Sequence, residues 1–196
     1  MDTKEYRQVV SDKSITSSKS FNDYLYGWLV LKAQEENGER FVMKRSFVFS
    51  KMEKELGMTR KTLAKYFDYF VEVGLVVDGG DKWILIDLGN EGFWIETEIL
   101  ERLIETKKRY AISAYVYLRK GRWLLAQKGK EKVPITLGQV KEYLGITNNS
   151  KGNNYIITDL FEEYRVLGLL RYDLVKGHEG NRQFYVLSGV GQDYYF

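Results

Sequence analysis

Cationic and hydroxyl side chains gather in one segment of the sequence, between Gly57 and Gly74. Apolar residues at 63, 67, 70 and 71 indicate one face of a helix there, so the polar residues fall on the opposite face. Lysine and arginine suit phosphates and guanine edges, and hydroxyl and phenol groups suit hydrogen bonds to base edges in a major groove. The polar residues of this segment are Thr59, Arg60, Lys61, Thr62, Lys65, Tyr66 and Tyr69.

These residue types favour contact with double-stranded DNA. Thr59 is expected to cap the helix and to leave its N-terminus near a phosphate. A second interpretation is that Tyr66 and Tyr69 pack against another domain, while the cations are merely solvated. The spacing alone leaves both interpretations open.

Basic charge is concentrated in two windows, although the 196-residue chain has a net charge of only +3. Eight lysines and arginines stand against two glutamates between residues 40 and 65, and nine against one between 107 and 132. Clustered basic charge is the electrostatic footprint of nucleic-acid binding, although a charge run can also be a solvated face. From these windows we add Lys44, Arg45, Lys107, Lys108 and Arg109 to the candidate DNA contacts.

A repeat organises the chain. The segments 49–59 and 137–147 both place apolar residues at i, i+3 and i+7 and both reach a glycine, which predicts two short helices. Ser50-x-x-Glu53 is typical of a capping box for the first helix, and Thr136 can cap the second. Each glycine is followed by a polar turn and a longer amphipathic helix, predicted over 59–73 and 153–167.

Each longer helix is followed by a predicted hairpin. Leu75 to Val77 and Trp83 to Ile86 flank the turn Asp78-Gly-Gly-Asp81, and a similar pair of strands flanks residues 176–180. Helices predicted over 21–35 and 110–118 precede the two units, and residues 98–106 form an extra helix. The order helix, helix, turn, helix, hairpin is that of a winged helix-turn-helix domain.

We therefore expect a mainly α chain with small β-hairpin wings, an α+β fold made of two winged helix-turn-helix domains in tandem. The first domain is expected over 18–88 and the second over 93–187, with residues 88–92 as the joint. A single proline and few glycine-rich patches argue against a long flexible linker.

The stretch from Leu56 to Leu75 resembles the helix-turn-helix core of bacterial winged-helix proteins, in which a Ser- or Thr-capped recognition helix ends in Gly-Leu before the wing. The tandem layout is similar to plasmid and phage replication initiators of Gram-positive bacteria. The resemblance implies sequence-specific binding of double-stranded DNA, with initiation of DNA replication as the expected role. Transcription regulation is the first alternative, because single-domain regulators share the motif, and a protein-protein interaction module is the second.

The second unit departs from this pattern. Counted back from the glycine that ends each helix, Asp159 takes the position of Lys65, and Glu162 and Glu163 follow. An acidic face is repelled by a major groove, so we expect this unit to contact the DNA backbone through its basic window and through Lys176 and Arg182 of its wing. The alternative is that the acidic helix is a protein-binding face.

Composition and motifs argue against several classes of site and protein, namely metal sites, ATP-driven enzymes and membrane proteins. With no cysteine and one histidine, His178, a thiolate or histidine-rich metal site is excluded within one chain, and we expect no metal and no cofactor. The G-x-x-x-x-G-K-[ST] motif is absent, which disfavours an ATP-driven initiator, and we expect a non-enzymatic protein. No apolar stretch approaches the length of a membrane span, so a cytoplasmic protein, with a homodimer as a possible assembly, is expected.

Overall fold

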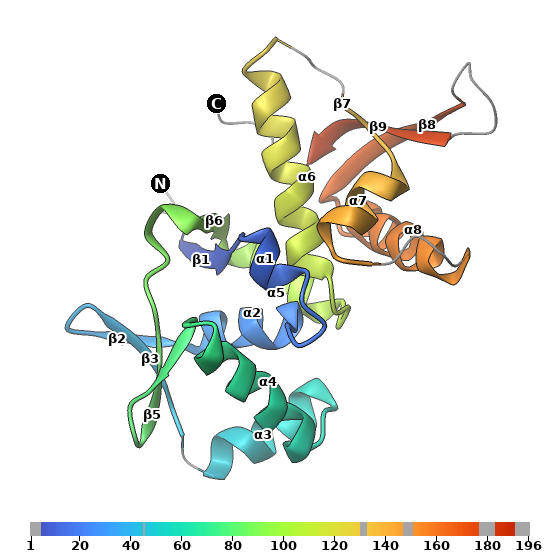
Figure 1. Ribbon diagram of the computed structural model, residues 1–196. Helices are drawn as coiled ribbons and strands as arrows, with labels where there is room; N and C mark the ends of the chain where they lie inside the picture. Colours follow the sequence, from blue (N-terminus) through green and yellow to red (C-terminus); the bar gives the residue numbers. More distant parts are fainter. Residues whose placement is uncertain (1–4, 45, 130–132, 147–150, 177–182, 191–196) are drawn as a thin grey trace. The chain divides into compact units, whose positions relative to one another are not determined.

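The computed structural model describes residues 5–44, 46–129, 133–146, 151–176 and 183–190 (Figure 1). The chain is a mixed α+β protein with small antiparallel sheets, and it divides into two compact units, residues 1–109 and 110–196. Among the described residues, no helix combines the length and apolar character needed to cross a lipid bilayer.

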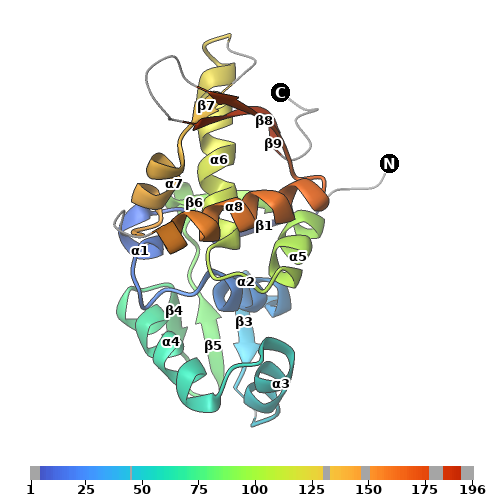
Figure 2. The ribbon, with the colours of Figure 1, turned by 90° about the vertical axis from the view of Figure 1, so that its right-hand side faces the viewer.

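Unit 1 contains a four-stranded antiparallel sheet in the order β2-β3-β5-β4 and three helices that lie to one side of it (Figure 1 and Figure 2). The strands are β2 (Gln34–Glu36), β3 (Glu39–Met43), β4 (Val76–Asp78) and β5 (Lys82–Leu85). The helices are α2 (Asp23–Lys32), α3 (Ser46–Leu56) and α4 (Arg60–Glu72).

The β2-β3 hairpin corrects one sequence prediction, because the helix expected over 21–35 ends at Lys32. The hairpin turns at Asn37-Gly38, whose φ angles are +52° and +78°. Positive φ at both central residues is the geometry of a tight hairpin turn, and Asn-Gly is the pair that adopts it most readily. This local signal was present in the sequence.

The core of unit 1 is built around α2, which is buried on every side from Asp23 to Val30. A helix that is apolar all round must be covered on all faces. Aromatic rings connect it to α4: the Tyr26 and Phe70 ring centroids lie 5.6 Å apart, and Phe70 is 6.1 Å from Phe67. These rings anchor α4 against the rest of the unit.

A two-stranded ribbon and further short helices complete unit 1. Strand β1 (Tyr6–Val10) pairs antiparallel with β6 (Gly92–Glu96), so residues on both sides of the expected joint belong to the same unit. Its other elements are α1 (Lys13–Thr16), η1 (Gly89–Glu91) and α5 (Thr97–Glu105). The expected domains, 18–88 and 93–187, therefore divide the chain at a different point from the compact units, because pairing between strands that lie far apart in the sequence leaves no local signal.

Unit 2 repeats the element order of the central part of unit 1, which runs helix, strand, helix, helix, strand, strand once β2 is left out. Its sheet has the order β7-β9-β8, which matches β3-β5-β4 when each strand is counted along its own unit. The helices are α6 (Ala111–Ala126), α7 (Leu137–Tyr143) and α8 (Lys151–Val166), and the strands are β7 (Val133–Ile135), β8 (Leu170–Lys176) and β9 (Gln183–Val190). Helix α6 continues eight residues beyond the predicted end.

A buried glutamine joins the ribbon to the loop after β5. The Gln8 side chain is 2% exposed, its amide nitrogen donates to the Gly89 carbonyl at 2.8 Å, and its oxygen accepts from the Leu88 N–H at 3.1 Å. Gly92 lies against this side chain so closely that a Cβ there would overlap it. The backbone of Gly92 is extended, so only space, not conformation, requires a glycine.

We predict that Gly92→Ala lowers the free energy of unfolding by about 1–3 kcal/mol, the usual cost of forcing an extra methyl group into a packed site. Chemical denaturation followed by circular dichroism measures the change. In a Gln8→Ala background the same substitution should cost less, because the overlapping side chain is gone.

Gly121→Ala in α6 is the matched control. Nothing lies within 4 Å of the position of its Cβ, and alanine is the better helix former, so stability should stay equal or rise. Equal stability of Gly92→Ala and the wild type would show that the ribbon is not packed as described.

Candidate nucleic-acid interface

Helix α4 is seated by an apolar stripe, which determines the face that it presents to solvent. Leu63, Phe67 and Phe70 are almost completely buried, and the Phe67 ring lies 4.9 Å from the ring of Trp83 on β5. Because a helix turns once in 3.6 residues, the positions between these anchors must face outward. The sequence prediction of the buried face is confirmed at these three positions, whereas Val71 is exposed.

The exposed face of α4 is cationic in its first half and acidic in its second. Arg60, Lys61 and Lys65 are exposed, and Lys61 and Lys65 form no ion pair with the described residues. Asp68 and Glu72 are exposed one and two turns further on. Positive charge is thus restricted to the end of the helix that begins after the turn, where recognition helices usually meet base edges.

The N-terminus of α4 is already occupied by protein groups. The Thr59 hydroxyl accepts from the Thr62 N–H at 3.3 Å, and the two hydroxyls lie 3.0 Å apart. A Glu53 carboxylate oxygen accepts from the Arg60 N–H at 2.6 Å. A carboxylate from α3 therefore takes one of the N–H groups at this helix end, and the expected contact with a phosphate stays a prediction.

The same contact corrects the expected capping box. Helix α3 begins at Ser46, so Ser50 lies inside the helix and cannot cap it. Glu53 reaches forward to the next helix instead of back to its own N-terminus. In the second repeat the expected cap is confirmed, since the Thr136 hydroxyl accepts from the Gln139 N–H and the Gln139 side chain accepts from the Thr136 N–H.

Three candidate contacts are held by other parts of unit 1. The Tyr69 hydroxyl donates to the Ile15 carbonyl at 3.3 Å, and the Arg109 guanidinium donates to the Ser18 and Phe21 carbonyls at 3.3 Å. Lys44 forms an ion pair with Asp78, and its ammonium lies 3.9 Å from the centre of the Trp83 ring. The charged and hydroxyl groups of these residues made them candidates for DNA contact in the sequence, but their partners depend on the tertiary structure.

The turn of the β4-β5 hairpin carries acidic side chains and not basic ones. Hydrogen bonds from Lys44 and then from the Gly80 N–H hold the pKa of Asp78 below its usual value, so this carboxylate stays ionised. Asp81 is exposed beside it. Such a turn does not suit close approach to phosphates.

The remaining candidates differ in accessibility. Lys107 is exposed with a φ of +54°, whereas Lys108 is half-buried and its N–H donates to the Thr106 hydroxyl at 3.2 Å. Thr62 and Tyr66 are half-buried. Arg45 and Arg182 lie outside the described residues, and for Lys176, at the end of β8, only the backbone is described.

The corresponding face of unit 2 is chemically different. On α8, Glu162 accepts from the Tyr172 hydroxyl at 2.5 Å and from Arg165 at 2.9 Å, and Asp159 is half-buried. Tyr155 and Val166 are 69% and 77% exposed at the two ends of the helix. The face combines ionised acid with exposed apolar groups, in contrast to the cationic first half of α4.

One member of the second basic window also has a structural partner. The Arg119 guanidinium on α6 donates to the Val190 carbonyl of β9 at 2.8 Å. A buried lysine that the sequence did not single out, Lys141 on α7, donates to the Asn154 side chain on α8 at 2.6 Å. Both contacts hold helices and strands of unit 2 together.

The chain matches no protein-family model, no curated protein and no solved structure. Within the described residues, no group of acidic or histidine side chains is arranged to hold a metal ion. The chemistry of the α4 surface must therefore be judged from its own residues.

We predict that Glu53→Ala lowers the free energy of unfolding by about 1 kcal/mol, because the first N–H of α4 loses its acceptor. Glu53→Gln should cost less, since an amide oxygen still accepts. Lys54→Ala, one residue away on the exposed side of α3, is the control and should change stability little. Equal effects at 53 and 54, measured by urea denaturation, would contradict the capping role.

Removing the Tyr172 hydroxyl should change the acidity of α8. The Tyr172 hydrogen bond and then that of Arg165 lower the pKa of Glu162, so Tyr172→Phe should raise this pKa toward its usual value. A carboxylate with a lowered pKa stabilises the folded state above its unfolded pKa, and the contribution is lost as pH falls through the folded pKa. The variant should therefore lose less stability on acidification.

A carboxyl ¹³C titration followed by NMR measures the pKa directly. Arg165→Gln serves as the comparison and should produce the smaller rise. An unchanged pKa of Glu162 in Tyr172→Phe would show that the hydroxyl does not contact it in solution.

Proposed function

We propose that the chain is a sequence-specific double-stranded-DNA-binding protein composed of two winged helix-turn-helix units, with α4 as the helix that enters the major groove. The observation that carries this proposal is the cationic first half of α4, in which Arg60, Lys61 and Lys65 project from a helix seated by three buried side chains. A rigid support is what base reading needs, because discrimination depends on fixed donor positions.

The arrangement around α4 supports the same function. Helix α3 precedes it across the short turn at Gly57, and the hairpin β4-β5 follows it and pairs with β3. This is the element order of a winged helix, with α4 in the place of the recognition helix. Since the hairpin turn is acidic, we assign the reading of sequence to α4 and not to the wing.

Unit 2 is assigned a supporting role on DNA. The acid of α8 is unsuited to a groove, whereas Lys107 at the end of unit 1 and Lys128 after α6 are exposed and can meet phosphates. Backbone contacts of this kind position a protein on a duplex without reading its sequence. Helix α4 would thus contribute specificity, while unit 2 and Lys107 of unit 1 would contribute affinity.

A replication initiator of plasmid or phage type is the biological role that we propose, and non-enzymatic binding is its mechanism. Its support is that unit 2 and the central part of unit 1 share an element order and a strand order within one chain. Transcription regulation uses the same chemistry, and the neighbouring DNA separates the two roles. Iterated short repeats beside the gene favour initiation, and a single palindrome at a promoter favours regulation.

The α4 assignment is tested with Lys61→Ala combined with Lys65→Ala. A cognate duplex is first selected from a random pool with the wild-type protein, and affinities for it and for a scrambled duplex are then titrated at fixed salt. Each good base contact contributes about 1–3 kcal/mol of discrimination, so the ratio of specific to non-specific affinity should fall roughly tenfold or more.

Lys107→Ala combined with Lys128→Ala removes the same charge from other segments and is the control. It should weaken binding to both duplexes alike and reduce the salt dependence of binding, because fewer counterions are released. If the control loses specificity while the α4 variant keeps it, α4 is not the reading helix.

A protein-interaction module is the second candidate function. Tyr155 and Val166, both highly exposed on α8, favour it, because aromatic and aliphatic groups among acids suit a protein partner better than a phosphate backbone. Absence of duplex binding by the wild-type chain at low salt would favour this function over the first.

A further inference from the structure

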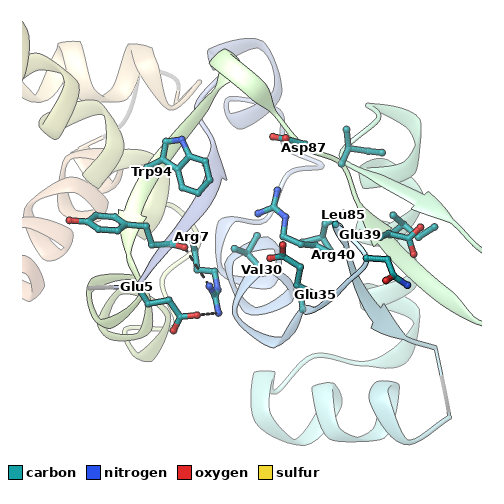
Figure 3. A pocket seen from close by; sticks show the side chains of 15 residues that line it. Glu5, Arg7, Val30, Glu35, Glu39, Arg40, Leu85, Asp87 and Trp94 are labelled. Carbon is teal, nitrogen blue, oxygen red and sulfur yellow. Dashed lines mark hydrogen bonds and ion pairs between the residues drawn. The ribbon is translucent and has the colours of Figure 1, made fainter. Parts of the chain in front are cut away.

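A cavity of about 560 Å³ opens between the β1-β6 ribbon and the β2-β3-β5 face of unit 1 (Figure 3). Trp94, Glu5 and Arg7 lie on the ribbon side, and Glu35, Arg40 and Asp87 lie on the sheet side. Its volume is within the range of pockets that hold small organic ligands. The cavity lies entirely in unit 1 and uses none of the residues assigned to DNA.

Two aromatic side chains form one wall of the cavity. Gln8 pairs with Trp94 and Tyr6 pairs with Glu96 in the ribbon, so Tyr6 and Trp94 lie on the same face of it. Trp94 is 59% exposed and Tyr6 is 46% exposed, although Val9 and Ile95, on the opposite face, are buried. Large aromatic groups left open beside a cavity offer ring faces to a ligand.

The charges around the cavity are predominantly negative. Four carboxylates line it against the two guanidinium groups of Arg7 and Arg40. Arg7 is paired with Glu5 at 2.5 Å and Glu39 is paired with Lys82, whereas Arg40 contacts the Gln8 side chain at 3.5 Å. Glu35 and Asp87 have no basic partner among the described residues.

The face of the sheet that points away from the cavity packs against α4. On β5, Ile84 lines the cavity, while the neighbouring Trp83 packs on Phe67 of α4. Gln8, behind the cavity, is held at both ends by the loop after β5. These contacts hold β5 and the ribbon in place independently of any ligand, as expected of a preformed site.

We propose that this cavity binds an organic cation, a protonated amine or onium group carried on an apolar or aromatic body. The cation lies between the open face of Trp94 and the carboxylates of Glu35 and Asp87, and the apolar body contacts Tyr6 and Ile84. Ring quadrupoles and carboxylates both attract a weakly hydrated cation, and neither attracts an anion. This site is independent of the proposed DNA-binding function.

Two probes of the same shape and opposite charge test the proposal. Tetraphenylphosphonium and tetraphenylborate are titrated into the full chain, and binding is followed by calorimetry and by quenching of tryptophan fluorescence. Binding at the site is defined as the part that Trp94→Ala removes, after circular dichroism shows that this variant is folded. The phosphonium should bind there about tenfold more tightly than the borate.

Charge variants identify the groups responsible. Glu35→Gln combined with Asp87→Asn should remove most of the preference for the phosphonium. Glu101→Gln combined with Glu105→Gln on the exposed side of α5 changes the net charge equally and should leave the preference intact.

Equal affinity for the two probes, preference for the borate, or phosphonium binding unaffected by Trp94→Ala would each overturn the proposal. Preference for the borate would assign the cavity to an anion held by Arg40. None of these outcomes depends on whether the chain binds DNA, so failure here leaves the proposed function standing.

Discussion

The seating of α4 is the constraint on which the candidate interface depends. Leu63, Phe67 and Phe70 are buried together, and once these three are fixed, the rotation of the helix about its axis is fixed as well. Lys61 and Lys65 must then face solvent. Aromatic contacts that run from α2 through Phe70 and Phe67 to Trp83 hold this orientation. The contacts that stabilise the unit therefore also determine the direction in which the cationic first half of α4 faces.

Polar side chains that reach between elements complete this framework. Glu53 accepts from an N–H at the start of α4, and Gln8 hydrogen-bonds to two backbone groups of the loop after β5. Arg109 donates to three carbonyls between α1 and α2. Buried or half-buried backbone groups need such partners, because leaving them unpaired is costly. Each of these residues is polar or charged and might be taken for a binding residue in isolation. Their contacts show that they hold the fold.

The two units share an architecture and differ in surface chemistry. The strand orders β3-β5-β4 and β7-β9-β8 match, and both longer helices end in a left-handed glycine. Yet Asp159 takes the position of Lys65 on α8, and Glu162 on the same helix accepts hydrogen bonds from Tyr172 and Arg165. Similar backbone positions thus carry side chains of different charge, so the proposed division of reading and backbone contact rests on side chains and not on the fold.

Helical periodicity and contacts within four residues were enough to predict the repeat, the buried stripe of α4, its cationic face and the cap at Thr136. The Asn37-Gly38 hairpin was equally local and was overlooked. The folded structure was needed to reveal the pairing of β1 with β6, the partners of Lys44, Tyr69 and Arg109, and the cavity beside Trp94. These features join residues dozens of positions apart, and no periodicity records which distant side chains meet when the core closes.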